Sequence, residues 1–188
     1  ARQIQLSSNI PLESTAFTIN MVCGSGLRAV TLASQSLQCG DANVVIAGGV
    51  ENMTRGPWVM SKSAKPYGND SKLFDSSFGW RFVNPKMKEM YGTHAMGETA
   101  ENLAEQFGVS REDQDKFALW SQQKAAAAQA SGRLAEEIVK VEIPRRKQDA
   151  LIFDQDEFIK PTSTIEGLAK LRAAFKKEGG SVTAGNAS

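Results

Sequence analysis

The sequence predicts an α/β fold, and three consecutive segments near its start support that prediction. Residues 16–19 and 42–47 are short apolar runs, and residues 24–40 between them carry apolar side chains at helical spacing. Short, nearly continuous apolar runs on either side of an amphipathic helix are typical of parallel strands that are covered on both faces. We therefore expect a strand-helix-strand unit in this region, closed by Gly48 and Gly49.

A less regular segment follows, from about residue 51 to residue 91. It is rich in Gly, Pro, Ser, Lys and Met and contains several aromatic residues. A loop of this length without secondary structure is uncommon in a compact domain unless it is functional, so we expect an inserted subdomain to begin here.

The second half of the chain predicts further helices and strands. One helix spans residues 98–107 and ends at Gly108; the next begins at Ser110, whose spacing to Asp113 resembles a capping box, and runs to about residue 131. The apolar residues of this second helix, which we expect to face the core, are Phe117, Leu119, Trp120 and Ala125 to Ala128. The remaining expected elements are a strand at 137–143, an exposed basic loop at 144–147, a helix at 165–177 and a strand that begins at 181.

Composition excludes several classes of function. Of the 188 residues, 41% are hydrophobic and 23% are charged, and 22 basic against 21 acidic residues give a formal net charge of +1. This balance gives no electrostatic reason to expect nucleic acid or an anionic membrane as a partner. No segment has the apolar length of a membrane span, and no signal segment opens the chain. We expect a soluble, cytoplasmic protein.

The two ends of the chain suggest a piece of a longer protein. The first residues have helical spacing without a cap, and the last residues form a strand and a small-residue turn that then stops. The two cysteines, Cys23 and Cys39, lie at opposite ends of the first long helix, so we expect no disulfide between them. Two free thiols fit a reducing compartment.

Cys23 is the candidate catalytic residue. It follows an apolar run and precedes the helix, where unpaired backbone N–H groups and the helix dipole favour thiolate over thiol. Gly24 and Gly26 have no side chain, so an acyl thioester can approach the sulfur while the N–H of Cys23 faces the developing oxyanion. The alternative is a buried cysteine that packs as a small hydrophobic residue.

The sequence offers few other chemical groups. His94 is the only histidine; it is either a general base for Cys23 or, as is more common for a lone loop histidine, a surface or hydrogen-bonding residue. Met87, Met90 and Met96 surround it in sequence and either line an apolar ligand tunnel or pack in the ordinary way. One histidine and two distant cysteines do not make a metal site, so we expect no metal.

Four segments occur together in the order found in a known family. They are Asn20–Leu27, Ala47–Met53, Met96–Asn102 and Val182–Ser188. The first two resemble the nucleophile region of the thiolases, the acyl-CoA acetyltransferases. The third resembles the thiolase loop-domain signature, and the fourth resembles the strand and turn near the pantetheine arm. The resemblance extends over essentially the whole chain.

The resemblance implies the five-layered αβαβα thiolase fold, in which two similar α/β halves pack together and a loop domain is inserted in the first. Residues 1–50 would then be part of the N-terminal half, residues 51–180 the inserted loop domain, and residues 181–188 the returning strand. The resemblance also implies that Cys23 attacks the thioester and carries the acyl group. Coenzyme A enters as the thioester substrate, and no cofactor is expected.

The resemblance further implies a set of coenzyme A contacts. The positions that match the lining of the coenzyme tunnel are Met87, Met96, Lys160, Phe175, Ala184, Ala187 and Ser188. Lys160 stands where an arginine is common; lysine keeps the charge and loses the planar stacking surface. Ala95 stands where many members have a histidine, with His94 one position earlier, and Gly167 replaces a frequent serine.

Three catalytic residues of the family belong to its second half: the activating histidine, a second cysteine that acts as acid and base, and an asparagine that holds a water. None of them has a counterpart in this chain, so we expect the 188 residues alone to have negligible turnover, because condensation also needs a base. The resemblance to thiolases also implies that the complete protein is a homo-oligomer, either a dimer or a tetramer.

The substrate and the class of function leave alternatives. Residues 79–85 and the signature around Glu98 look more like thiolases that cleave 3-oxoadipyl-CoA than like acetoacetyl-CoA enzymes. Arg81 either meets a distal carboxylate or is a surface or subunit-contact residue. A related condensing enzyme of fatty-acid or polyketide type would lack the Met96–Asn102 signature. The third possibility is a noncatalytic coenzyme-binding or assembly fragment.

Overall fold

The computed structural model describes residues 1–187 and divides the chain into two compact units, residues 1–81 and 82–188. The expected boundaries at residues 50 and 180 fall inside these units, and the assignment of residues 1–50, 51–180 and 181–188 to halves and insertion stays a prediction. In the described residues, no helix is both long and apolar enough to cross a membrane.

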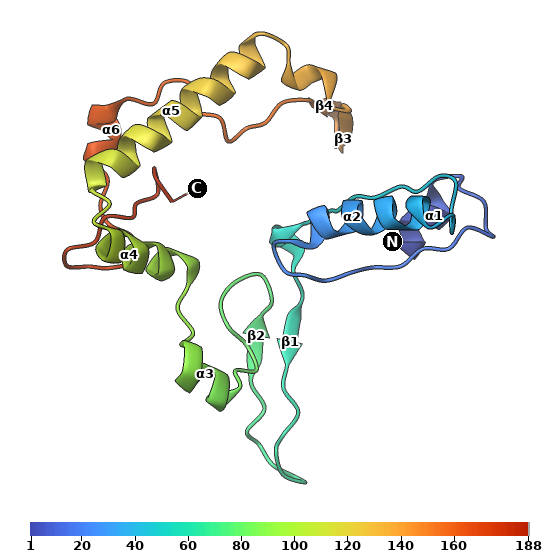
Figure 1. The fold of residues 1–188 in the computed structure, drawn as a ribbon, viewed down its shortest axis with the longest axis horizontal. Helices are drawn as coiled ribbons and strands as arrows, with labels where there is room; N and C mark the ends of the chain where they lie inside the picture. Colours follow the sequence, from blue (N-terminus) through green and yellow to red (C-terminus); the bar gives the residue numbers. More distant parts are fainter. Residues whose placement is uncertain (188) are drawn as a thin grey trace. The chain divides into compact units, whose positions relative to one another are not determined.

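Helix α1 (Arg2–Ser7) opens the first unit and is tied to the segment that follows it (Figure 1). The Arg2 guanidinium donates hydrogen bonds to the carbonyl oxygens of Leu12, at 3.3 Å, and Ser14, at 2.9 Å. The amide of Gln5, which is only 5% exposed, donates to the carbonyl oxygen of Pro11 at 2.7 Å. These polar side chains therefore fix the return of the chain toward the Cys23 segment.

Helix α2 (Ser25–Gln38) confirms the helix expected at residues 24–40. The two flanking strands, expected at residues 16–19 and 42–47, are wrong: neither segment joins a sheet in the described residues. A strand exists only where a neighbouring backbone accepts and donates its hydrogen bonds, and an apolar run alone does not supply one. Their side chains accordingly stay exposed, as Val44 does at 84% and Ile46 at 78%.

The rest of the first unit is a small hairpin. Strands β1 (Trp58–Met60) and β2 (Leu73–Asp75) pair antiparallel, with Val59 opposite Phe74. The short 3₁₀ helix η1 (Met53–Arg55) precedes them. The Ser77 hydroxyl donates to the carbonyl oxygen of Met53 at 2.8 Å and holds the end of the hairpin after β2 to η1.

Capping residues begin the helices of the second unit. Helix α3 (Pro85–Tyr91) has Asn84 as its N-cap, whose side-chain oxygen accepts from the N–H of Lys86 at 3.0 Å, and proline as its first residue. Helix α4 (Met96–Phe107) starts where the Glu98 carboxylate accepts from the N–H of Ala95 at 2.7 Å.

The next two boundaries were both expected from the sequence. Helix α4 ends at Gly108, which has a left-handed φ of 63°. Helix α5 (Arg111–Ala130) is capped by Ser110, whose hydroxyl oxygen accepts from the N–H of Asp113 at 3.1 Å. Both predicted helices are therefore confirmed. The predicted packing face of α5 is wrong in part, because Phe117 is 67% and Trp120 is 53% exposed in this chain.

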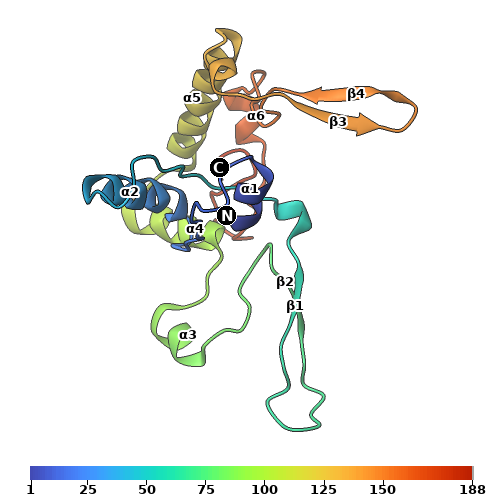
Figure 2. The same cartoon turned by 90° about the vertical axis from the view of Figure 1, so that its right-hand side faces the viewer.

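The expected strand at 137–143 and basic loop at 144–147 are one hairpin instead. After the 3₁₀ helix η2 (Leu134–Glu136), strands β3 (Val141–Arg145) and β4 (Gln148–Phe153) pair antiparallel and project as a two-stranded ribbon (Figure 2). Pro144 lacks an N–H and sits at a register shift between Ile143 and Arg145, a position that proline tolerates. The basic residues therefore form the tip of a hairpin, with Lys147 at a φ of 59°.

Helix α6 (Ile165–Ala169) is much shorter than the expected 165–177. The chain leaves the helix because Ala173 forms an antiparallel bridge with Thr183, and the N–H of Ala174 donates to the carbonyl oxygen of Val182 at 2.9 Å. This pairing draws the segment after residue 181 into the unit. The expected strand there is present only as this bridge.

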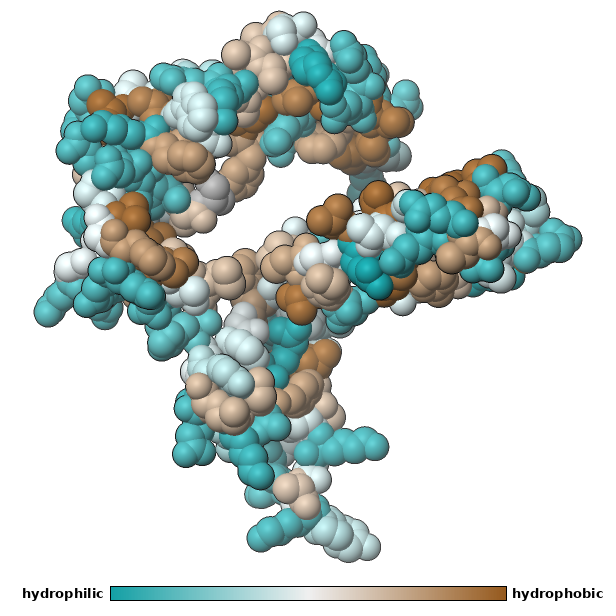
Figure 3. All heavy atoms as spheres, viewed as in Figure 1, coloured by the Kyte–Doolittle hydropathy of each residue, from teal (hydrophilic) through white to brown (hydrophobic). Residues whose placement is uncertain are grey.

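The core of the second unit is small and partly polar. Its most buried residues are Ala118, Leu168 and Val182, together with Glu101, Asp115 and Thr183. Most large apolar side chains of both units lie at the surface, where the brown atoms of Figure 3 show them. The second unit is therefore held together by a buried hydrogen-bonded network as well as by apolar packing.

Candidate active site

Cys23 lies exposed in a tight turn directly before α2. Val22, the residue before it, has a φ of 50°, which is an outlier for a β-branched side chain. Backbone strain of this kind costs on the order of 1–3 kcal/mol and persists only where neighbouring groups impose it. Cys23 is exposed in this chain, which differs from the alternative of a buried cysteine.

Two polar side chains impose the conformation of this turn. The Ser25 hydroxyl accepts from the N–H of Met21 at 2.8 Å and donates to the carbonyl oxygen of Val22 at 2.7 Å. The side-chain oxygen of Asn20 accepts from the N–H of Val22 at 2.9 Å. The turn therefore does not depend on a neighbouring strand for its shape.

Gly24 is the N-cap of α2 and has little space around it. A Cβ at this position would lie 3.1 Å from the Cε atom of Met21 and 3.3 Å from its carbonyl oxygen, closer than most real contacts. At Gly26 a Cβ would meet nothing within 4 Å, so the space beside that residue is open. An exposed thiol at the start of a 14-residue helix can accept an acyl group.

The second unit brings two of the expected coenzyme positions close together. Met96 is the first residue of α4 and is 80% exposed. Phe175, 43% exposed, lies with its ring directly against Gly97, the next residue of that helix. A Cβ on Gly97 would lie 2.3 Å from two ring carbons, so only glycine lets the ring occupy this place.

Gly97→Ala is therefore expected to displace the Phe175 ring. Overpacking of this kind costs about 1–3 kcal/mol, and because the ring is partly exposed, we expect it to swing away rather than unfold the helix. If Phe175 contacts coenzyme A as expected from the sequence, the KM of the complete protein for a coenzyme A thioester should rise, with a smaller change in kcat. Gly108→Ala, at the other end of α4, where a Cβ meets nothing but φ is 63°, is the control for general destabilisation. An unchanged KM for Gly97→Ala would contradict a coenzyme contact by Phe175.

Ala184 and Ala187 share one turn, and both are exposed. The N–H of Ala187 donates to the carbonyl oxygen of Thr183 at 3.0 Å, and the side-chain oxygen of Asn186 accepts from the N–H of Thr183 at 2.7 Å. Ser188, also an expected coenzyme contact, lies outside the described residues. The turn therefore presents two methyl groups on a backbone that is closed by its own hydrogen bonds.

The two other expected coenzyme positions lie on separate elements. Met87 is on α3 and is 50% exposed. Lys160 lies between β4 and α6; its N–H donates to the Gln122 side chain at 2.7 Å, and its ammonium group donates to the carbonyl oxygen of Glu157 at 3.3 Å. His94 lies beside α4, with Nδ1 3.2 Å from the amide nitrogen of Asn102. In residues 1–187, no hydrogen bond or ion pair joins the side chain of Met87 or Lys160 to the Ala184–Ala187 turn.

Sequence reasoning missed Glu101 and Asp115, which are 5% and 2% exposed. Burial raises the pKa of the Glu101 carboxyl, but hydrogen bonds from Ser181 and Val182 lower it more, so that this pKa lies below its ordinary value. Asp115 pairs with Arg111 at 2.8 Å. The available signal was weak: Asp115 stands three residues before the buried Ala118, on the same helix face.

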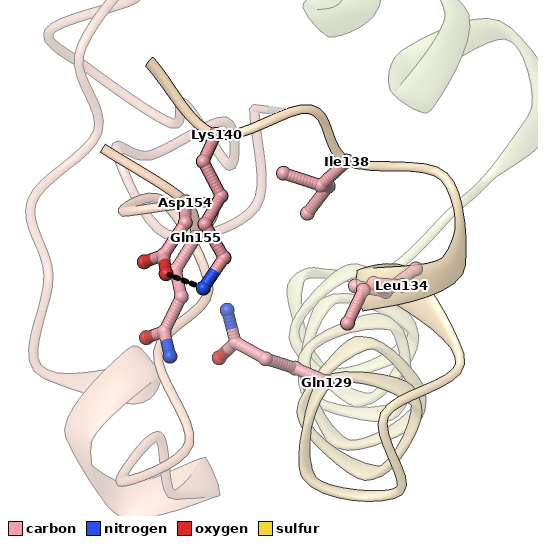
Figure 4. A pocket seen from close by; sticks show the side chains of 7 residues that line it. Gln129, Leu134, Ile138, Lys140, Asp154 and Gln155 are labelled. Carbon is pink, nitrogen blue, oxygen red and sulfur yellow. Dashed lines mark ion pairs between the residues drawn. The ribbon is translucent and has the colours of Figure 1, made fainter. Parts of the chain in front are cut away.

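A hollow in the second unit is lined by other residues. Its wall is formed by Gln129, Leu134, Ala135, Ile138, Lys140, Asp154 and Gln155. The ammonium group of Lys140 and the carboxylate of Asp154 form an ion pair at 3.4 Å on one side of it (Figure 4). None of the expected coenzyme positions contributes to this lining. In residues 1–187, no group of three or more His, Cys, Asp or Glu side chains is arranged to hold a metal.

The exposed thiol of Cys23 at the start of α2 fits the acyl-carrying role expected from the sequence. The model of the thiolase N-terminal domain matches residues 1–188. The chain belongs to the thiolase family and corresponds to its N-terminal domain.

Curated relatives match the whole chain. It is 52% identical over 187 residues to a beta-ketoadipyl-CoA thiolase of Acinetobacter baylyi, covering 100% of this chain and 46% of that protein. It is 48% identical over 188 residues to a 3-oxoadipyl-CoA/3-oxo-5,6-dehydrosuberyl-CoA thiolase of Escherichia coli, and 50% identical over 190 residues to an acetyl-CoA acetyltransferase of Chromobacterium violaceum, each covering 100% of this chain and 47% of the relative. The chain thus spans about half the length of the curated relatives it matches.

Proposed function

We propose that this chain is the N-terminal part of a thiolase subunit, an acyl-CoA C-acetyltransferase that works through an acyl-cysteine at Cys23. The observation that carries the proposal is the exposed thiol at the first turn of α2, held there by Ser25 and Asn20. Thiolase names among relatives that match the full length of the chain support the same assignment.

In the proposed acylation step, the sulfur of Cys23 forms a bond to the carbonyl carbon of an acyl-CoA. The electrons of the carbonyl double bond move to oxygen, and the positive end of the α2 dipole favours that charge. The carbon–sulfur bond to coenzyme A then breaks, and coenzyme A leaves as a thiolate that takes a proton. In thiolysis of a 3-oxoacyl-CoA, the sulfur instead attacks the C3 carbonyl carbon; the bond between C2 and C3 breaks, C2 takes a proton, and acetyl-CoA leaves, so that the shortened acyl group stays on Cys23. That group then passes to the sulfur of a second coenzyme A, and Claisen condensation is the reverse.

Proton transfer in the second step requires groups that this chain does not supply. We therefore propose that the complete protein provides the base and that the 188 residues alone turn over negligibly. Coenzyme A is substrate in this scheme, and no further cofactor is part of it. A homo-oligomeric complete protein in the cytoplasm is also part of the proposal.

Seven positions are proposed to line the coenzyme A path. They are Met87, Met96, Lys160, Phe175, Ala184, Ala187 and Ser188. The exposure of Met96 and of the two alanines, and the close seat of Phe175 on Gly97, support this proposal. The lysine at position 160 supplies a positive charge suited to the phosphate groups of the coenzyme.

We propose 3-oxoadipyl-CoA as the preferred substrate. The names of the relatives from Acinetobacter baylyi and Escherichia coli support this choice over acetoacetyl-CoA. Arg81 is exposed, and its guanidinium donates to the carbonyl oxygen of Gly79 at 3.0 Å, which leaves other donors of its fork for a carboxylate.

Turnover of the two substrates by the complete protein tests this function. We expect thiolysis of both, with a higher kcat/KM for 3-oxoadipyl-CoA. A preference for acetoacetyl-CoA would contradict the substrate assignment, and binding of either thioester without acylation of Cys23 would contradict the enzymatic function itself. Arg81→Gln should lower kcat/KM only for 3-oxoadipyl-CoA if Arg81 contacts the distal carboxylate.

A further inference from the structure

Two buried carboxylates from different helices converge on residues 181–186. Glu101, on α4, accepts hydrogen bonds from the N–H of Ser181 with both oxygens, at 2.9 Å each, and from the N–H of Val182 at 2.8 Å. It also accepts from the Ser181 hydroxyl at 3.0 Å. Asp115, on α5, accepts from the side-chain amide of Asn186 at 2.9 Å. Together, Glu101 and Asp115 form a carboxylate pair.

The carboxylate pair fixes the turn that carries Ala184 and Ala187. The Asn186 amide that Asp115 holds also donates to the carbonyl oxygen of Ser181 at 3.1 Å. Thr183, which is fully buried, accepts from the N–H of Gly185 with its hydroxyl at 3.1 Å. The contacts that hold the turn are all buried or partly buried, whereas Ala184 and Ala187 are exposed.

The helices themselves are locked where they hold the turn. The Arg111 guanidinium bonds Asp115 at 2.8 Å and the carbonyl oxygens of Leu168 at 2.6 Å and Leu171 at 3.1 Å. The Gln114 amide donates to the Ser181 hydroxyl at 2.9 Å. Burying a carboxylate lowers the stability of the fold unless all its hydrogen-bonding partners are in place. A simple connecting loop would not need two such buried charges.

We propose that Glu101 and Asp115 are positioning residues that preorganise the Ala184–Ala187 turn as a rigid apolar surface for the arm of the coenzyme A thioester. This inference rests on the proposed function. A long, flexible ligand arm loses conformational freedom on binding, and a surface that is already ordered reduces the additional cost of ordering the protein. The carboxylate pair acts through the turn and does not touch the reacting atoms, so it affects only thioesters that carry the arm.

Single-turnover acylation of Cys23 in the complete protein tests this role with two acyl donors. Acetyl-CoA carries the arm, and S-ethyl thioacetate does not. Glu101→Gln puts an amide NH₂ group opposite N–H donors. Losing hydrogen bonds to a charged acceptor corresponds to a change of about 10–100-fold in the rate of a step that depends on them. We expect acylation by acetyl-CoA to slow by that factor and acylation by S-ethyl thioacetate to stay unchanged.

Two further variants make the test specific. Asp115→Asn keeps one oxygen but weakens the contacts of this side chain with Asn186 and Arg111. It gives the same selective slowing if Glu101→Gln proves too unstable to purify. Glu105→Gln is the matched control, because Glu105 lies one turn along α4 and is exposed in an ion pair with Lys176 at 3.0 Å. It should slow neither donor.

The outcomes separate this inference from the proposed function. Equal slowing with both donors, or no slowing with either, in Glu101→Gln and Asp115→Asn would overturn the positioning role while wild-type acylation still supports the enzyme. Failure of the wild-type protein to form any acyl-Cys23 with acetyl-CoA would overturn the proposed function, and the positioning role with it.

Discussion

Replacing Cys23 with serine should lower thiolysis by the complete protein on the order of 10⁴-fold or more. A serine side chain is similar in size to cysteine, but its hydroxyl is far less nucleophilic at neutral pH. No acyl-enzyme can then accumulate. The measurement is steady-state thiolysis, followed by the loss of the 3-oxoacyl-CoA. The structure gives no reason for a large loss of stability, because the side chain of Cys23 is exposed.

Cys39→Ser is the matched control for this experiment. Cys39 is the C-cap of α2 and is also an exposed free thiol, but it lies at the opposite end of the helix, where the dipole disfavours negative charge. We expect this variant to keep wild-type turnover. Comparable loss in both variants, or retained turnover in Cys23→Ser, would remove Cys23 from the mechanism.

Glu101→Gln should destabilise the complete protein by about 2–3 kcal/mol at neutral pH, the largest stability effect we expect from one exchange of near-equal volume. The reason is that three buried or partly buried donors of Ser181 and Val182 lose a charged acceptor. The measurement is the urea midpoint of unfolding, with Glu105→Gln as the exposed-carboxylate control.

The pH dependence of this difference has a definite sign. The folded pKa of Glu101 lies below its ordinary value of 4.5, because its hydrogen bonds outweigh its burial. The stabilisation is therefore fully present above the unfolded-state pKa and is lost as the pH falls through the folded-state pKa. The gap between wild type and Glu101→Gln should stay constant at neutral pH and shrink only below about pH 4.5. A gap that already shrinks near neutrality would contradict the depressed pKa.

Local signals in the sequence predicted helices well. Ser110 and Gly108 set the ends of α5 and α4 through backbone hydrogen bonds and a left-handed φ, and both depend only on nearby residues. The start of α2 behind Cys23 was predictable for the same reason. Here the side chains of Asn20 and Ser25 complete the turn without help from distant parts of the chain.

Long-range pairing was what the sequence pattern could not predict. The apolar runs at 16–19 and 42–47 indicate strands, but a strand also requires a partner, and in residues 1–187 none pairs with them. Helix α6 is shorter than expected because Ala173 forms a bridge with Thr183, and no local sequence pattern predicts this bridge. Glu101 escaped notice for the same reason, since its partners lie 80 and 81 residues away.

Mass spectrometry of the complete protein after exposure to acetyl-CoA tests the central claim most directly. We expect a single acetyl group per chain, located on the peptide that contains Cys23 and absent from the one that contains Cys39. The adduct should disappear on addition of coenzyme A, as the acyl group is transferred back. Bound acetyl-CoA with an unmodified Cys23, or an adduct on both cysteines alike, would contradict it.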